Sequence, residues 1–347
     1  MDHPDTLRPY IARVLVTLAI GAFALLLWRL SGLLLLVFGA VVVAAVLRAL
    51  MGGVTRWTPL PDGAALAVVV LVLTALMVLV LWLFGAQLAV QVETLRQALP
   101  GAWSQFQAWL EGSPIGPTVR DLMQQGRDSA SGVAAHAGAL AMSATGGIAN
   151  LLLVVVGGIY FAAQPALYRG GVLKLFPAPA RGTIGDAFDA SGHALKMWLG
   201  GQLLAMTMVG VLTGIGLWLL GVPVAFGLAL IAALLDFVPI IGPIAAAVPA
   251  VLLAFTVSPQ IGLATIALFV VVQQVESNVL QPLIQQRAVD LPPALLLFSL
   301  FGVGALFGIL GLLLAAPLTV VVYVLVKRLY VREALDTQVD VPTPDEG

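Results

Sequence analysis

One carboxylate lies in the middle of a long apolar stretch, because Asp236 is the only charged residue between Lys196 and Glu276. The surrounding sequence, LLDFVPIIGP, also contains three residues that interrupt helices, which are Pro239, Gly242 and Pro243. A charged side chain in an apolar helix is costly, so it usually faces a cavity or a partner, or it titrates. Asp236 therefore predicts a proton-coupling or cation-coupling site. The alternative is structural: the carboxylate accepts hydrogen bonds from amides freed at Pro239, or lies near the mouth of a hairpin.

A second group of polar residues follows further along the chain. It consists of Gln273, Gln274, Glu276, Asn278 and Gln281. Helical spacing places Gln274, Asn278 and Gln281 on one face, with Gln273 and Glu276 alongside. If this helix starts near Ile261, Glu276 lies at membrane depth, and the polar face lines a path or bonds to a broken helix. If the helix has already reached the membrane surface, these groups face water instead.

Motifs of soluble enzymes are missing from the sequence. It has no phosphate-binding loop, no His-Glu-x-x-His pair and no cysteine. Its three histidines, His3, His136 and His193, are too scattered to indicate a metal site. A net charge of -1 gives no sign of nucleic-acid binding. We therefore expect no enzymatic activity, no metal or cofactor, and no nucleic-acid partner.

The composition indicates a membrane protein. Hydrophobic residues make up 61% of the chain and charged residues 10%, whereas about 25% of residues are charged in soluble domains. Repeated apolar runs have the length of a membrane-crossing α-helix, which is roughly 20 residues. The sequence therefore predicts an all-α, polytopic integral membrane protein with the lipid bilayer as its partner. We place spans at 11–28, 33–47, 64–86, 146–163, 200–220 and 260–281, with a turn at 29–32 that joins the first two into a hairpin.

Two further apolar segments, 222–255 and 291–326, do not fit this template. A straight helix of about 35 residues would reach about 50 Å, too long for one span and too short for two with a turn. Both segments contain prolines or glycines that break helices, including Gly304 and Gly308 in the second. Each is either a broken span or a re-entrant hairpin, giving about eight membrane segments in total. Hairpins are favoured because they place Arg287 on the same side as the other Lys-rich and Arg-rich loops.

Interrupted helices in transporters commonly bind substrates and ions near their breaks, where backbone amides and carbonyls are unsatisfied. Glycine pairs such as Gly210 with Gly214, and Gly304 with Gly308, have a second explanation, which is close helix packing. We predict a substrate or ion pathway at both breaks and the polar helix, formed by Asp236, Pro239, Gly242, Pro243, Gln273, Gln274, Glu276, Asn278, Gln281, Gly304 and Gly308.

A sizeable polar block divides the chain. We expect N-terminal membrane spans at 1–86, an extramembrane amphipathic helical region at 87–143, a fourth span and cytoplasmic linker at 144–199, a membrane transport core at 200–332 and a disordered tail at 333–347. The apolar stripe from Leu88 to Leu110 packs on its own chain or forms an oligomer contact, and we expect a homo-oligomer. A second amphipathic stretch, 184–199, is expected at the cytoplasmic membrane surface. The distribution of Lys and Arg predicts that both termini are cytoplasmic.

Several short motifs occur in a fixed order between Gly200 and Val326. They are Gly201-Gln202, Leu219-Leu220-Gly221-Val222-Pro223, Pro239-Ile240-Ile241-Gly242-Pro243, Glu276-Ser277-Asn278-Val279-Leu280-Gln281-Pro282, Gly308-Ile309-Leu310-Gly311 and Ala315-Ala316-Pro317-Leu318. This ordered set resembles the autoinducer-2 exporter family of bacterial membrane proteins, whereas the N-terminal third matches only in layout. The chain departs from the family pattern at Gln285-Gln286-Arg287, and at Leu291-Pro292-Pro293, where a histidine that could titrate is missing.

The resemblance implies transport across the bacterial inner membrane, in different relatives of a small signalling molecule or of sodium and protons. We therefore expect a secondary transporter that exports a small polar solute such as autoinducer-2, or exchanges sodium for protons. Since no nucleotide-binding motif is present, an ion gradient is the expected energy source. The alternatives are a passive channel and a membrane scaffold that moves nothing.

Overall fold

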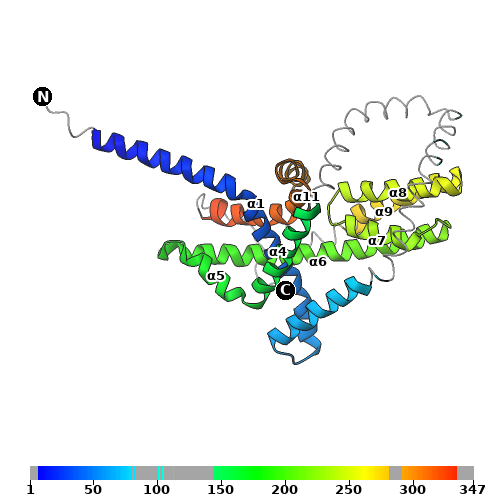
Figure 1. Ribbon diagram of the computed structural model, residues 1–347, viewed down its shortest axis with the longest axis horizontal. Coiled ribbons are helices and arrows are strands. Elements are labelled where there is room, and N and C mark those ends of the chain that lie inside the picture. The colour runs from blue at the N-terminus through cyan, green and yellow to red at the C-terminus, as the bar shows by residue number, and fades with distance from the viewer. Residues whose placement is uncertain are drawn as a thin grey trace.

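The structure is built from helices (Figure 1). The computed structural model describes residues 7–79, 144–280 and 291–333, together with residues 82, 101, 104 and 112. These parts contain no strand, which confirms the predicted all-α fold. Among them are five helices that are long and apolar enough to cross a membrane, or six if the bent pair α4 (Ala144–Ala163) and α5 (Pro165–Lys174) forms one span. The predicted polar region 87–143 and the tail lie almost entirely outside the described residues.

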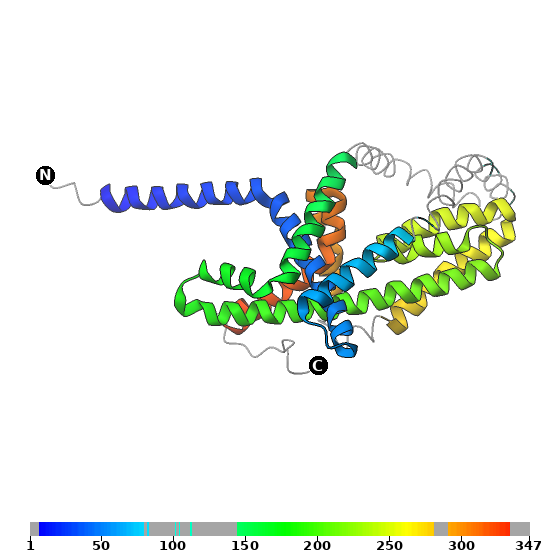
Figure 2. The same ribbon diagram turned by 60° about the horizontal axis from the view of Figure 1, so that its bottom comes forward.

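The first helix differs from the sequence-based prediction. A turn at 29–32 was expected, but α1 runs without interruption over Leu7–Trp57, so the prediction of two spans joined by a hairpin is wrong. Residues 29–32 include no proline, and the Ser31 hydroxyl donates to the Trp28 carbonyl at 2.7 Å, within the same helix. The helix changes direction along its length (Figure 2), which accommodates the long apolar run without a turn.

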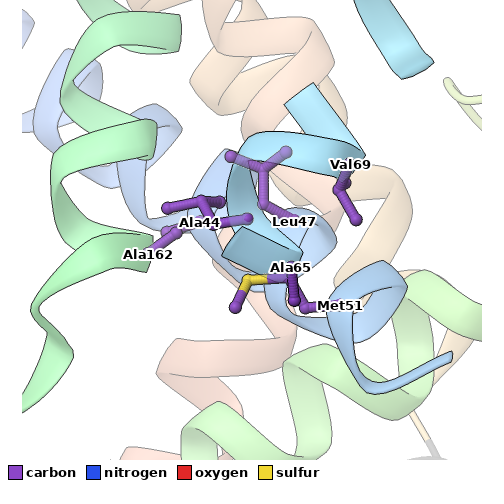
Figure 3. Packing of buried hydrophobic residues seen from close by; sticks show 7 residues of the cluster. Ala44, Leu47, Met51, Ala65, Val69 and Ala162 are labelled. Atoms are coloured by element: carbon purple, nitrogen blue, oxygen red, sulfur yellow. The ribbon is translucent and has the colours of Figure 1, made fainter. Parts of the chain in front are cut away.

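Small and apolar side chains join α1 to its neighbours, α4 and the helix Asp62–Leu79. Figure 3 shows the cluster, which comprises Ala44, Leu47 and Met51 of α1, Ala65, Leu66 and Val69 of the second helix, and Ala162 of α4. Arg48 strengthens this junction, because its Nε donates to the Ala162 carbonyl at 3.1 Å and its guanidinium lies 3.6 Å from the Asp62 carboxylate. The three helices therefore form one packed unit.

The longest helix of the C-terminal half is α6, Arg181–Leu219, which follows a short 3-10 turn, Ala178–Ala180. The helix crosses position 200 without a break. The apolar side of the amphipathic stretch 184–199 is buried at Leu195 and Leu199, which pack with residues of α1 and of α11 (Pro293–Val326). This part of α6 therefore packs against its own chain.

Helices α6, α7 (Ala225–Leu235), α8 (Ile241–Val257) and α9 (Pro259–Val275) pack against one another, and they lie side by side in Figures 1 and 2. Glycines allow α6 and α7 to approach closely. A Cβ added to Gly210 would lie 2.9 Å from the Cβ of Ala233, and one added to Gly214 would lie 3.1 Å from that of Ala229. The packing explanation of Gly210 and Gly214 is confirmed.

Both long apolar segments are interrupted helices, as the sequence predicted. The first is α7, a short turn and α8. The second, α11, has a non-helical residue at Gly308 (φ 64°, ψ −144°). The chain folds back at Gly308, so that residues before and after it lie close together. A Cβ on Gly304 would lie 3.4 Å from the Leu312 side chain, and one on Gly311 would overlap the Val303 carbonyl. We call the turn 236–242 the first break and Gly308 the second break.

Candidate transport site

Asp236 lies at the first break, directly after α7, and it is 1% exposed. Neither of its carboxylate oxygens has a hydrogen-bond partner among the described residues. The amides of Phe237, Val238 and Gly242 donate to backbone carbonyls rather than to this carboxylate. The alternative in which this carboxylate accepts hydrogen bonds from amides freed at the break is therefore wrong, because these amides donate to carbonyls of α7 and of the break.

The second acid, Glu276, is the first residue of a π-helical turn, Glu276–Leu280, which directly follows α9. Such turns occur frequently at functional sites. The Glu276 side chain is buried, and its Oε2 accepts a hydrogen bond of 2.9 Å from Gln273 Nε2. It lies close enough to Asp236 for the two carboxylates to interact electrostatically. The two acids therefore lie within electrostatic range of each other, one directly after α7 and one directly after α9.

The predicted polar face of α9 divides into two. Glu276 is buried and the half-buried Gln273 bonds to it, whereas Gln274 and Asn278 are exposed. Asn278 Nδ2 donates to the Gln274 carbonyl at 2.9 Å, a bond within the same helix. Gln281 lies outside the described residues. Gln274 and Asn278 therefore lie on the exposed side of this helix, and their role in the pathway stays a prediction.

Gln202 of α6 was missed as a site residue. Its Nε2 donates a hydrogen bond of 2.7 Å to the Asp236 backbone carbonyl. One turn earlier, the Trp198 ring meets the Phe237 ring edge-on, with 6.1 Å between centroids. In the sequence, Gly201-Gln202 stood out only as a motif that resembles a family. Its contact with Asp236 depends on how α6 packs against α7, which the sequence alone does not show.

The two breaks are linked by apolar packing. Val238, two residues after Asp236, is buried in a cluster with Leu300 and Ala315, which lie on opposite sides of the second break. Pro239 and Pro243 are half-buried and Gly242 is buried beside them. Gly242 has no room for a side chain, because a Cβ would overlap the Leu235 carbonyl. The structure therefore places the first break against the parts of α11 that lie before and after Gly308.

Other buried polar atoms occur in the same helical unit. The Thr213 hydroxyl on α6 and the Thr265 hydroxyl on α9 are fully buried and lack a hydrogen-bond partner among the described residues. No group of three His, Cys, Asp or Glu side chains in the described ranges could hold a metal ion. Two carboxylates and a neighbouring amide instead offer oxygen ligands, which suit a proton or a hard cation such as sodium.

Comparison with protein families gives a match over nearly the whole chain. The sequence profile of a family described as AI-2E family transporter matches residues 15–330. This match confirms the resemblance found in the motifs of the C-terminal half.

Individual relatives carry names that refer to transport. YrrI of Bacillus subtilis, provisionally named a transport protein, is 35% identical over 140 residues, which cover 40% of this chain and only 38% of the relative. A provisionally named transport protein of Mycobacterium tuberculosis is 31% identical over 326 residues, covering 88% of this chain and 85% of the relative. TqsA of Escherichia coli, named an AI-2 transport protein, is 25% identical over 300 residues, covering 83% of this chain and 84% of the relative.

Proposed function

Because the chain belongs to the AI-2E family of transporters, we propose that it is a secondary transporter whose transport site lies at the two helix breaks. It exports a small polar solute such as autoinducer-2, or exchanges sodium for protons. Asp236 and Glu276 couple the movement of a proton or cation to this transport. Support for these roles comes from the charge balance of the site.

The main support for the proposal is the charge of Asp236 and Glu276, which we call the acid pair. Asp236 and Glu276 are the only charged residues between Lys196 and Arg287. Both are buried, and neither forms an ion pair with a basic residue in the part of the chain that the structure describes. Two ionised carboxylates without a counter-charge are strongly disfavoured in an apolar environment. In this proposal, protons or a mobile cation balance the charge that no described basic residue balances, and an exchangeable balancing charge is what a gradient-driven transporter requires.

Flux in proteoliposomes tests the proposal. Vesicles with an internal pH dye receive sodium or, separately, autoinducer-2, and we expect at least one of them to move protons. Asp236→Asn should abolish this response and Glu276→Gln should reduce it, because each removes one ionisable group. Asp186→Asn is the matched control, since Asp186 is an exposed acid on α6. Wild-type flux in the Asp236→Asn, Glu276→Gln double variant would refute the role of the pair, and flux insensitive to ion gradients would indicate a channel.

The orientation follows from the basic residues. We propose that the protein lies in the bacterial inner membrane with both termini in the cytoplasm. The segment that would then be cytoplasmic, α5 and the first part of α6, contains Arg169, Lys174, Arg181 and Lys196, in agreement with the enrichment of basic residues on that side. Reporter fusions test this: a fluorescent protein at the C-terminus should be bright, whereas a periplasm-dependent phosphatase at the same position should be inactive.

We also propose that the protein assembles as a homo-oligomer. The N-terminal part of α1 extends away from the remaining helices (Figure 1), and its side chains, including Leu15, Leu25 and Trp28, are more than half exposed. This apolar surface can pack against lipid or against a second copy. Native mass spectrometry of the protein released from lipid nanodiscs should give a multiple of the 36.1 kDa chain mass, and a single-chain mass would refute this proposal.

A further inference from the structure

Two β-branched residues have a backbone conformation that such residues rarely adopt. Val224 has φ 63° and ψ 26°, and Ile240 has φ 70° and ψ −53°. They are the only non-glycine residues with positive φ in the part of the chain that the structure describes. Positive φ is unfavourable for a β-branched residue because its side chain crowds the backbone. The two positions flank α7, the helix that ends at Leu235, directly before Asp236.

The turn at Ile240 is the tighter of the two. Ile241 N donates to the Pro239 carbonyl at 2.8 Å, which closes a three-residue turn with Ile240 at its centre. A γ-turn of this hand is rare and strained. The Ile240 side chain is 50% exposed, so burial of that side chain contributes little to holding the conformation.

Contacts on both sides of Ile240 hold the strained turn in place. Before it, the Asp236 carbonyl is bonded to Gln202, and Val238 is buried against α11. After it, Gly242 lies so close to the Leu235 carbonyl that a Cβ at this position would overlap the carbonyl. Strained residues persist only where their surroundings fix them, and they cluster at sites where strain assists a conformational change. At the other end of α7, the preceding Gly221 also has positive φ, 69°.

We propose that α7 is a hinged gate over the acid pair, with hinges at Val224 and Ile240. In the conformation described above, the gate is closed, and Asp236 is sealed from solvent. Strain at the two hinges destabilises this closed state and favours opening. When the first break leaves Gln202 and α11, Asp236 becomes accessible to a solute or cation. The purpose of the gate rests on the proposed function, but its movement can be tested independently of transport.

Thiol labelling tests the gate directly, because the natural chain contains no cysteine. A Val238→Cys variant of the full chain in proteoliposomes carries one thiol, and the Val238 side chain is only 7% exposed. A small methanethiosulfonate should react with it only when the gate opens. Adding Ile240→Gly removes strain from the closed state, so we expect labelling to slow by about fivefold. Adding Ile240→Val keeps the branched side chain and should leave the rate unchanged.

Val224→Gly gives a second test at the other hinge, and it should slow labelling in the same way. It also covers the case in which Ile240→Gly fails to fold, which a melting curve would show. The gate proposal is refuted if the glycine variants fold and their thiol reacts as fast as that of the Ile240→Val variant, or faster. Slower labelling in a protein that moves no solute or ion would support the gate while refuting the proposed transport function.

Discussion

Gln202 and Asp236 are 34 residues apart in the sequence, yet the amide of the first donates a hydrogen bond of 2.7 Å to the backbone carbonyl of the second. This bond ties the first break to the middle of α6. It satisfies a carbonyl at the end of α7, where helix termini leave carbonyls without helical partners. The position of the Asp236 carboxylate therefore depends on a side chain of another helix.

Gln202→Ala should loosen the first break. We expect a loss of about 1–3 kcal/mol in the free energy of unfolding, because the Asp236 carbonyl loses its partner in a partly buried place. Flux should fall with it, since Asp236 is no longer held in position. Thermal melting in detergent and vesicle flux measure the two effects. Thr207→Ala on the same helix is the control, because the Thr207 hydroxyl donates to its own helix at an exposed position, and equal losses in both variants would contradict the prediction.

Gly210→Ala should destabilise the contact between α6 and α7. The added methyl group would lie 2.9 Å from the Ala233 Cβ, so the helices must separate, at a cost of about 1–3 kcal/mol. Gly192→Ala is matched in chemistry and helix, but its Cβ would have no atom within 4 Å. That variant should be neutral or more stable, because alanine favours helices over glycine. Melting temperatures that shift equally would show that helix propensity, not packing, decides the result.

Gly308→Ala should disrupt the second break. Its φ of 64° and ψ of −144° lie in a region used almost only by glycine, and a side chain there costs about 1–3 kcal/mol. We expect a lower melting temperature and reduced flux, since the arms of α11 can no longer fold back without strain. Gly302→Ala in the same helix meets no atom within 4 Å and should keep both properties. An unchanged Gly308→Ala protein would show that the break tolerates a side chain.

Arg48→Met should weaken the N-terminal unit. The substitution removes the donor to the Ala162 carbonyl, and we expect a loss of about 1–3 kcal/mol. Asp62→Asn removes only the ion pair with Arg48, and Asp62 is 81% exposed. Exposed pairs contribute little to stability, so this variant should melt like the wild type. The prediction is wrong if Asp62→Asn proves as damaging as Arg48→Met.

The breaks could be predicted from the sequence because their causes are local. Proline lacks an amide proton, and glycine adopts backbone conformations closed to other residues, so a cluster such as Pro239, Gly242 and Pro243 favours a break. A single proline does not suffice, because Pro249 lies inside α8 and Pro317 lies inside α11. The prediction of a turn at 29–32 was wrong because this segment has no such local cause for a break. Ser31 and Gly32 are compatible with a turn, but nothing in that segment prevents a helix, and the Ser31 hydroxyl bonds back to the Trp28 carbonyl.

The candidate site was predicted in part. Asp236 and Glu276 stood out because charged groups are rare in such apolar segments, and the fold buries both within electrostatic range of each other. The role of Gln202, and the outward direction of Gln274 and Asn278, depend on how distant helices pack. A single sequence contains no local signal for such packing.

The unbalanced charge of Asp236 and Glu276 has an electrical consequence. No basic group among the described residues forms an ion pair with these two acids. Under the proposed function, the charge of the site therefore changes each time a proton or cation enters or leaves. A charge that moves through the membrane field gains or loses roughly 2.3 kcal/mol per 100 mV. Under the proposed function, the membrane voltage therefore acts on the transport cycle directly, and the rate of transport in the cell follows its energetic state as well as its solute concentrations.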